Sequence, residues 1–304
     1  MWGFFLIYVF IYRLFFVYFI LMTFNNDNDI RKFLTQYDVS KIFCNKENAI
    51  DFLLLTIDSN YKELNKKKSE VIYQLIIDNW DYNKALPIIR DMAFNKKYDD
   101  IKYNYNKNLY KKTCSNLVNR FGPNNNWSFN PFDYDGHMTR FIRNSEDILN
   151  DTDTYIELVV KNLWVKSLNM YRSFLFEYFI IKNKKDILPT LGNKSLTDFY
   201  YLGKSRDQKN SKSVTREFEK DYGPNWKQIA LSNPELVAKY LYTNQGEGRF
   251  GFEPRLFIIN LKDEHQTVEE IEEISKNINF GKSLPIDFEY KGVEYKTDAI
   301  VIYI

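Results

Sequence analysis

The stretch DILPTLGNKSLTDFYYLGKSRDQKNS, residues 186–211, decides the expected fold of this chain. The helical periodicity of the preceding residues is lost here, and the stretch divides into DILPTLG, TDFYYLG and SRDQKNS. Gly192–Asn193 and Gly203–Lys204 separate the three segments, and such pairs favour tight turns. The pattern therefore predicts three consecutive strands joined by turns.

Helical patterns flank these strands. An almost all-round apolar stretch predicts one long buried helix from about Asp153 to Lys182, with Asp151 and Asp153 as candidate N-caps. Downstream, the sequence predicts helices at Val214–Asp221 and Trp226–Tyr242 (interrupted at Asn233–Pro234), a strand at Arg255–Leu261, an acidic helix at Val268–Ile278 and a hairpin turning at Lys291–Gly292. The resulting order is helix, three strands, helix, strand.

The residues before this core have a helical character. From Asp29 to about Lys112 the pattern is amphipathic, most clearly at Ile50–Leu64 and Ser69–Trp80. Phe121–Gly136 is dense in Pro, Asn, Asp and Gly, which indicates a loop and a candidate domain boundary. We therefore expect a helical N-terminal region at 25–136 and an α/β (α+β) core with a C-terminal hairpin at 137–304.

Residues 1–24 form an apolar leader interrupted by Arg13. Its length suffices to span a bilayer, so it is a candidate membrane anchor. A signal peptide is disfavoured, because no basic segment precedes the run and no small-residue cleavage site follows it. An alternative is that residues 1–21 are an upstream extension of the reading frame and that Met22 starts the protein. We expect a cytoplasmic protein, or a membrane-anchored one if the leader is genuine.

The composition excludes few functions. The 304 residues are 44% hydrophobic and 27% charged, as in soluble globular proteins, and the net charge of +2 neither demands nor excludes a nucleic-acid partner. Lys66–Lys68 and Lys96–Lys97 are basic runs of the kind that usually lie on a solvated surface. The two cysteines and two histidines lie far apart, in no zinc-ligand spacing, and a reducing compartment fits them best.

Asp198, Asp207 and Lys209 carry the expected chemistry. Asp198 falls on the second predicted strand, and the turn at Gly203–Lys204 returns the third strand beside it. Because residues i and i+2 of a strand face the same side, Asp207 and Lys209 share a face. Two carboxylates suit magnesium, and a nearby lysine can orient or deprotonate a water that attacks a phosphate.

The spacing acid-x-Lys is weak by itself. It occurs at Asp100–Lys102, Asp207–Lys209, Glu289–Lys291 and Glu294–Lys296. The strongest rival combines Asp287 with Glu294 and Lys296, and Pro285 precedes its aspartate by two positions. We expect the rival to be inactive, because the eight residues that follow Lys296 leave no room for the helix and strand that complete the core.

From Thr197 to Leu261 the chain resembles nucleases of the PD-(D/E)xK superfamily, and type II restriction endonucleases in particular. The resemblance implies a restriction-endonuclease-like αβββαβ core, with Asp198 and Asp207 as ligands of Mg²⁺ and Lys209 as the catalytic lysine. Many members add a glutamate from the preceding helix, and Glu177 is the candidate here. The chain departs from the family pattern in having Thr197 in place of proline before the first aspartate.

The resemblance implies a homodimeric restriction endonuclease that cuts double-stranded DNA. Lys212, Ser213 and Thr215 are candidate phosphate contacts, although Ser213 also fits as the N-cap of the next helix. Arg249, in a glycine-rich loop, is a further candidate DNA contact or a plain loop residue. Two alternatives stay open: a repair or defence nuclease without a defined recognition site, and a membrane-anchored interaction protein without enzymatic activity.

Overall fold

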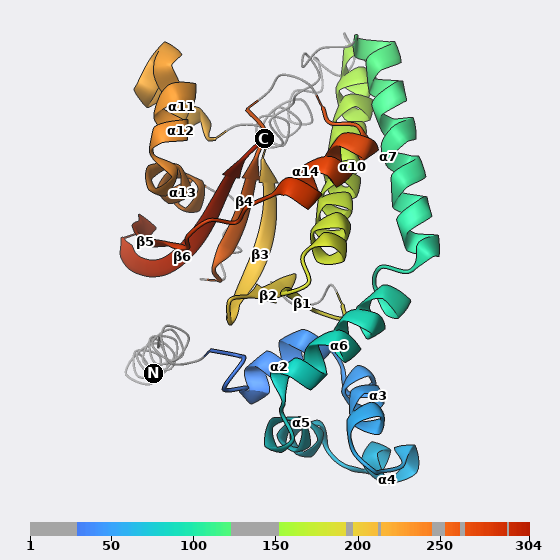
Figure 1. Ribbon diagram of the computed structural model, residues 1–304. Helices are drawn as coiled ribbons and strands as arrows, with labels where there is room; N and C mark the ends of the chain where they lie inside the picture. Colours follow the sequence, from blue (N-terminus) through green and yellow to red (C-terminus); the bar gives the residue numbers. More distant parts are fainter. Residues whose placement is uncertain are drawn as a thin grey trace, which may run out of the picture.

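The computed structural model describes residues 29–122, 152–192, 197–211, 214–244, 253–261, 265–290 and 292–304. In this part of the chain, a six-stranded mixed sheet has helices on both faces, and a group of N-terminal helices lies below it (Figure 1). The expected mixed α/β class is confirmed.

The strand order of the sheet is β1-β2-β3-β4-β6-β5. The strands are β1 (Leu188–Pro189), β2 (Phe199–Tyr201), β3 (Lys204–Ser211), β4 (Arg255–Ile259), β5 (Leu284–Tyr290) and β6 (Val293–Tyr303). The first three pair antiparallel, as predicted, and β4 then lies parallel to both β3 and β6. The predicted C-terminal hairpin forms by antiparallel pairing of β5 with β6, and β6 joins it to the rest of the sheet.

The flanking helices also follow the sequence. The long helix is α10 (Thr152–Asn183), and the crossover from β3 to β4 contains α11 (Arg216–Tyr222), the short 3-10 turn η1 (Gly223–Asn225), α12 (Trp226–Ser232) and α13 (Pro234–Thr243). The acidic helix is α14 (Val268–Asn277). Helix α10 packs against α7, α14 and β3, whereas α13 packs against β5 and β6, so the two groups cover opposite faces.

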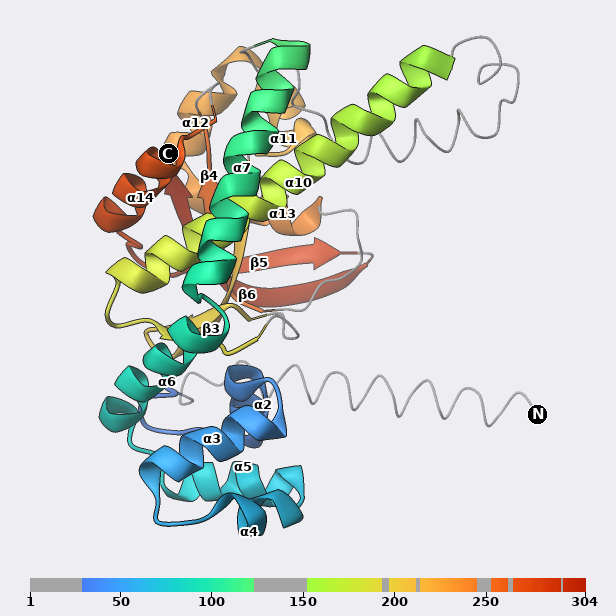
Figure 2. The same cartoon turned by 90° about the vertical axis from the view of Figure 1, so that its right-hand side faces the viewer.

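The N-terminal helices are α2 (Gln36–Phe43), α3 (Lys46–Thr56), α4 (Tyr61–Lys66), α5 (Ser69–Asp78), α6 (Tyr82–Lys96) and α7 (Asp100–Phe121). The predicted helix at Ile50–Leu64 is wrong in its continuity, because it is broken between α3 and α4. Asn60 accepts a hydrogen bond from the backbone of Glu63 and so starts a new helix as its N-cap. Helix α7 runs beside α10 (Figure 2).

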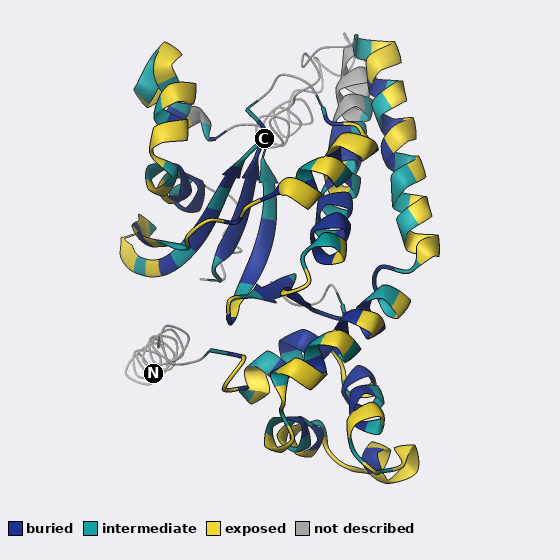
Figure 3. Ribbon diagram, viewed as in Figure 1, coloured by how far each residue is buried: buried dark blue, intermediate teal, exposed yellow. Residues whose placement is uncertain are grey.

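The sheet separates two apolar cores. All five residues of β4 are buried, and their side chains alternate: Leu256 and Ile258 face the α10 side, whereas Phe257 and Ile259 face the α13 side. The N-terminal helices contribute to the core on the α10 side, so they share its interior (Figure 3). This shared core brings residues from α6 and α7 close to the end of α10.

The apolar leader at residues 1–24 and nearly all of the predicted boundary at Phe121–Gly136 lie outside the described residues. Among the residues that the structure describes, none of the helices combines the length and apolar character that crossing a membrane requires.

Candidate active site

Strand β2 is shorter than β3, which leaves one edge of β3 open. The two strands pair only as far as Phe199 and Arg206, whereas β3 continues beside β4 to Ser211. Asp198 lies just before β2 rather than on it, although its backbone N–H donates to Arg206 O over 2.8 Å. Within the described chain, residues 207–211 therefore have a strand neighbour on one side only.

The Asp198 carboxylate lies across this open edge. Successive residues of a strand direct their backbone N–H groups to opposite edges, and the N–H of Asp207 donates towards β4, to Pro254 O, over 3.0 Å. The N–H of Gln208 points the other way and donates to Asp198 Oδ2 over 2.7 Å. This hydrogen bond replaces a ladder bond and holds Asp198 beside the next strand.

Asp207 and Lys209 share a face of β3, as their spacing predicts. Lys209 Nζ lies 2.8 Å from Asp207 Oδ1, and the Asp207 side chain is largely buried while that of Lys209 is 43% exposed. Arg255, the register partner of Asp207 on β4, places its Nε 3.3 Å from Asp207 Oδ2. Asp207 therefore holds the Lys209 ammonium group in place, and this group is exposed enough to contact solvent or a substrate.

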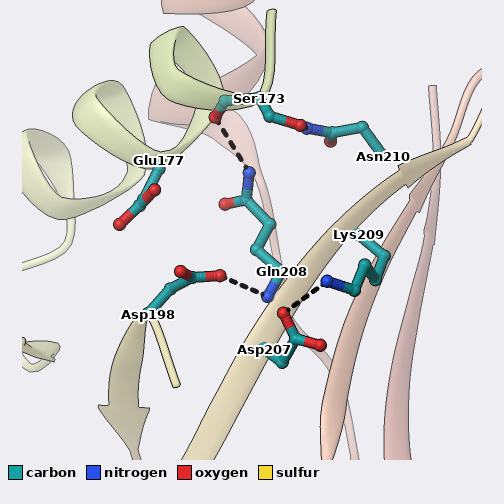
Figure 4. A pocket seen from close by; sticks show the side chains of 7 residues that line it. All are labelled: Ser173, Glu177, Asp198, Asp207, Gln208, Lys209 and Asn210. Carbon is teal, nitrogen blue, oxygen red and sulfur yellow. Dashed lines mark hydrogen bonds and ion pairs between the residues drawn. The ribbon is translucent and has the colours of Figure 1, made fainter. Parts of the chain in front are cut away.

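These side chains line one cavity of about 350 Å³. Its lining consists of Ser173, Glu177, Asp198, Asp207, Gln208, Lys209 and Asn210, contributed by α10, the start of β2 and the open half of β3 (Figure 4). The structure thus brings together all four residues that the sequence analysis nominated as catalytic. The cavity joins the two faces of the sheet around the edge of β3.

Glu177 is held by two residues of the N-terminal region. Lys97, at the end of α6, places Nζ 2.7 Å from Glu177 Oε1, and the Tyr98 hydroxyl donates to the same oxygen. Lys97 is only 6% exposed, so the interpretation of Lys96–Lys97 as solvated surface is wrong for Lys97. Its ammonium is buried because it has a carboxylate partner across the α6–α10 contact.

Among the carboxyl groups that line the cavity, Asp198 has a strongly shifted pKa. Burial raises the pKa of its carboxyl to about 8, and the negative charges of Glu177 and Asp207 act in the same direction. Lys97 and the hydrogen bond from Gln208 oppose this shift. Burial and Glu177 also raise the pKa of Tyr98, which keeps its hydroxyl protonated as a donor.

The side chains on the other face of β3 attach it to α10. Gln208 Nε2 donates to Ser173 O over 3.2 Å, and Asn210 Nδ2 donates to Ser173 Oγ over 2.8 Å. These bonds fix the distance between the strand that carries Asp207 and the helix that carries Glu177. Apart from Asp198, which lies just before β2, the residues that line the cavity therefore belong to α10 and β3.

The donor set fits a divalent cation that keeps part of its hydration shell. No group of three or more His, Cys, Asp or Glu side chains is arranged to hold a metal ion in the described part of the chain. Magnesium needs fewer protein ligands, because it typically binds one or two carboxylates and retains several waters. Ionised Asp198, whose pKa burial raises to about 8, would be stabilised by a positive charge at this place.

The candidate DNA contacts Lys212, Ser213 and Arg249 lie outside the described residues. The alternative role of Ser213 as an N-cap is wrong, because Thr215 caps α11 by accepting a hydrogen bond from Phe218 N–H. Thr215 Oγ1, a candidate phosphate contact, is therefore engaged as the N-cap of α11.

The rival set at the C-terminal hairpin lies on the exposed surface. Asp287 and Lys296 are cross-strand neighbours whose charged atoms lie 3.9 Å apart, with 72% and 77% of their side chains exposed. Glu294 is exposed and lies opposite Glu289. At Asp100–Lys102 the spacing falls on a helix, where the two side chains do not share a face.

Sequence reasoning missed Lys97, Tyr98, Ser173, Gln208 and Arg255. The nearest signal was YDD at 98–100, where Asp99 caps α7 and so marks a break between two helices directly after Lys97 and Tyr98. The contacts of Lys97 and Tyr98 span about eighty residues of sequence, and no local pattern encodes such a separation.

No family model matches the chain, and no curated protein or solved structure is detectably similar to it.

Proposed function

We propose that this protein is a magnesium-dependent endodeoxyribonuclease of the PD-(D/E)xK type, with a restriction-endonuclease-like core. The observation that carries the proposal is the convergence of Asp198, Asp207 and Lys209 on one cavity at the open edge of β3. The order of α10, three antiparallel strands, crossover helices and a parallel β4 is the arrangement expected for such a core.

The residues have separable roles in this proposal. Asp198 and Asp207 would hold the magnesium ion, which when bound supplies positive charge to the scissile phosphate and favours ionisation of a water. Lys209 Nζ, fixed 2.8 Å from Asp207 Oδ1, orients the attacking water and stabilises the negative charge that develops on the phosphate. The oxygen of the water bonds to phosphorus and one P–O ester bond breaks. The ester oxygen leaves as a hydroxyl group, and the proton that the water loses balances the one that this oxygen takes up.

Double-stranded DNA is the proposed substrate, and a homodimer is the proposed assembly. Two copies related by a two-fold axis place two such cavities on opposite strands of a symmetric site. A nuclease of this class that acts in repair or defence, without a defined recognition site, has the same chemistry and differs in its products.

The test is cleavage of a mixed-sequence plasmid by the purified full-length chain, with and without Mg²⁺. The variants are Asp207→Ala and Lys209→Ala, and the matched control is Lys296→Ala, which removes a lysine at the same acid-x-Lys spacing. We expect discrete, metal-dependent fragments from the wild type and the control, and none from the two cavity variants.

Sequencing the fragment ends would give the recognition site. A smear that both cavity variants abolish would favour a nuclease without a defined site. Cleavage that survives in both variants, or its absence from the wild type under all divalent cations, would refute the assignment of this cavity.

A further inference from the structure

The amide of Gln208 is anchored at one end only. Its side chain is 7% exposed and lines the cavity, and Nε2 donates to Ser173 O over 3.2 Å. A backbone carbonyl only accepts hydrogen bonds, so the nitrogen must face Ser173 and the amide cannot be flipped. Gln208 Oε1 is consequently fixed on the other side, where it faces the cavity towards Glu177 (Figure 4).

This oxygen is buried and accepts no hydrogen bond from the described residues. Leaving such an acceptor unsatisfied costs about 1–3 kcal/mol, so a native site normally supplies a donor. The donors that line the cavity have other partners: Asn210 Nδ2 donates to Ser173 Oγ, and Lys209 Nζ pairs with Asp207 on the other face of β3. Glu177 and Asp198 offer only acceptor oxygens once they are ionised, as they would be beside a cation.

The missing donor must lie among several carboxylates, so a positively charged donor is favoured there. Water on a divalent cation is such a donor, because its hydrogens point outward and it carries part of the charge of the ion. Magnesium retains several such waters when one or two carboxylates bind it. Side chains that hydrogen-bond to the ligands of a metal ion orient those ligands, and losing such a side chain typically costs about 10–100-fold in metal affinity.

We propose that Gln208 Oε1 binds a hydration water of the divalent cation held by Asp198 and Asp207. Gln208 is then a positioning residue that determines how tightly the cavity binds a hydrated ion such as Mg²⁺. This inference rests on the proposed function, since it concerns the same cation.

The test is calorimetric titration of the full-length chain with MgCl₂, without DNA. Gln208→Met removes the acceptor at nearly constant volume and should weaken Mg²⁺ binding by about tenfold or more. Gln208→Glu keeps an acceptor oxygen, loses the donor to Ser173 and adds negative charge, so it should bind Mg²⁺ at least as tightly as the wild type.

Gln266→Met is the matched control, because Gln266 is also buried, at 6% exposure, with an unpaired Oε1 outside the cavity lining. Its affinity for Mg²⁺ should equal that of the wild type, and melting in EDTA verifies that every variant is folded. The inference is overturned if Gln208→Met binds Mg²⁺ like the wild type.

It is also overturned if Gln208→Glu is weakened as much as Gln208→Met, because the bond to Ser173 would then explain both losses. Failure of the proposed function looks different: the wild type itself would neither bind Mg²⁺ nor cleave DNA. A wild type that binds and cleaves, together with an unaffected Gln208→Met, removes the role of Gln208 alone.

Discussion

Two hairpins of this molecule carry the same residue types and differ in what surrounds them. In the β2–β3 hairpin an aspartate precedes the first strand and Asp207 and Lys209 lie on the second; in the β5–β6 hairpin Asp287 lies on the first and Glu294 and Lys296 on the second. The first set lines the cavity beside α10, with Asp207 largely buried, whereas Asp287 and Lys296 are 72% and 77% exposed.

Strand length accounts for part of the difference. β5 pairs with β6 along its whole length, including Asp287 opposite Lys296, so the backbone is satisfied and the side chains extend into solvent. β2 begins only at Phe199, which pairs with Arg206, and the carboxylate of Asp198 satisfies the N–H of Gln208 instead. The same sequence pattern therefore lines a cavity where a helix covers an open strand edge, and lies on the surface where the strands are fully paired.

The largest expected difference between the hairpins is in catalysis. Asp198→Asn should reduce Mg²⁺-dependent DNA cleavage roughly a thousandfold, equivalent to about 4 kcal/mol of transition-state stabilisation, because it removes the charge of a proposed Mg²⁺ ligand. Asp287→Asn should leave the rate within about twofold, since surface substitutions have small effects. Single-turnover cleavage rates at saturating Mg²⁺ measure both, and equal losses would contradict the distinction between the hairpins.

The ion pairs Lys97–Glu177 and Lys296–Asp287 should also differ in how much they contribute to the free energy of unfolding. Lys97→Met leaves Glu177 buried without its cation, and the free energy of unfolding should fall by about 3–5 kcal/mol. Lys296→Met removes one partner of an exposed pair and should change it by less than about 0.5 kcal/mol.

Urea unfolding measures both values. The double variant Lys97→Met/Glu177→Gln serves as the control, because it removes both charges and should recover part of the loss. If it is no more stable than Lys97→Met alone, the pair is not what stabilises this contact.

The raised pKa of Asp198 predicts a pH effect in metal-free protein. The folded chain holds this proton up to about pH 8, whereas the unfolded chain releases it near pH 4. Folding therefore takes up a proton between these values, and stability falls as pH rises, by up to about 1.4 kcal/mol per pH unit.

The measurement is the difference in unfolding free energy between the wild type and Asp198→Asn from pH 5 to pH 8, in EDTA. The wild type should lose stability relative to the variant as pH rises, and Asp287→Asn provides the control. A difference that is constant across this range would show that Asp198 is not a poorly compensated buried carboxyl.

The smallest expected contrast lies in the turns. Gly203 and Gly292 both have positive φ, at 82° and 76°. A Cβ on Gly203 would lie 2.2 Å from Asp29 Oδ1, whereas one on Gly292 would lie in open space. Gly292→Ala should cost about 1 kcal/mol from backbone strain alone, and Gly203→Ala about 2. Thermal melting compares them; equal values would exclude the contact with Asp29 as a contribution.

Local patterns predicted the elements of the core well. Residues 186–211 form the three strands, and the long helix ends within one residue of its predicted limit at Lys182. Turn residues and apolar periodicity act over a few positions, so the sequence displays them directly. The spacing of Asp207 and Lys209 likewise fixes a shared face without knowledge of the rest of the chain.

The surroundings of the cavity were beyond such patterns. The contact of Lys97 with Glu177 joins two helices that are distant in sequence, and the same lysine beside a different helix would be solvated. Gln208 lies between Asp207 and Lys209, and its side chain faces the opposite side of the strand. The acid-x-Lys spacing therefore gives no reason to select it. Burial, which distinguishes the two hairpins, depends on which elements pack together.

The anchoring of Glu177 by Lys97 and Tyr98 has a consequence for building chimeras of this protein. A junction at the loop after Phe121, where the sequence alone would place it, would separate the carboxylate from both of its donors. A junction before α6 would keep them together. It would also keep Arg90, which donates to the carbonyl groups of Ile181 at the end of α10 and of Lys184 and Ile187 after it. The smallest transplantable unit of this protein therefore begins before Tyr82, and not at residue 137 as the composition of the chain suggests.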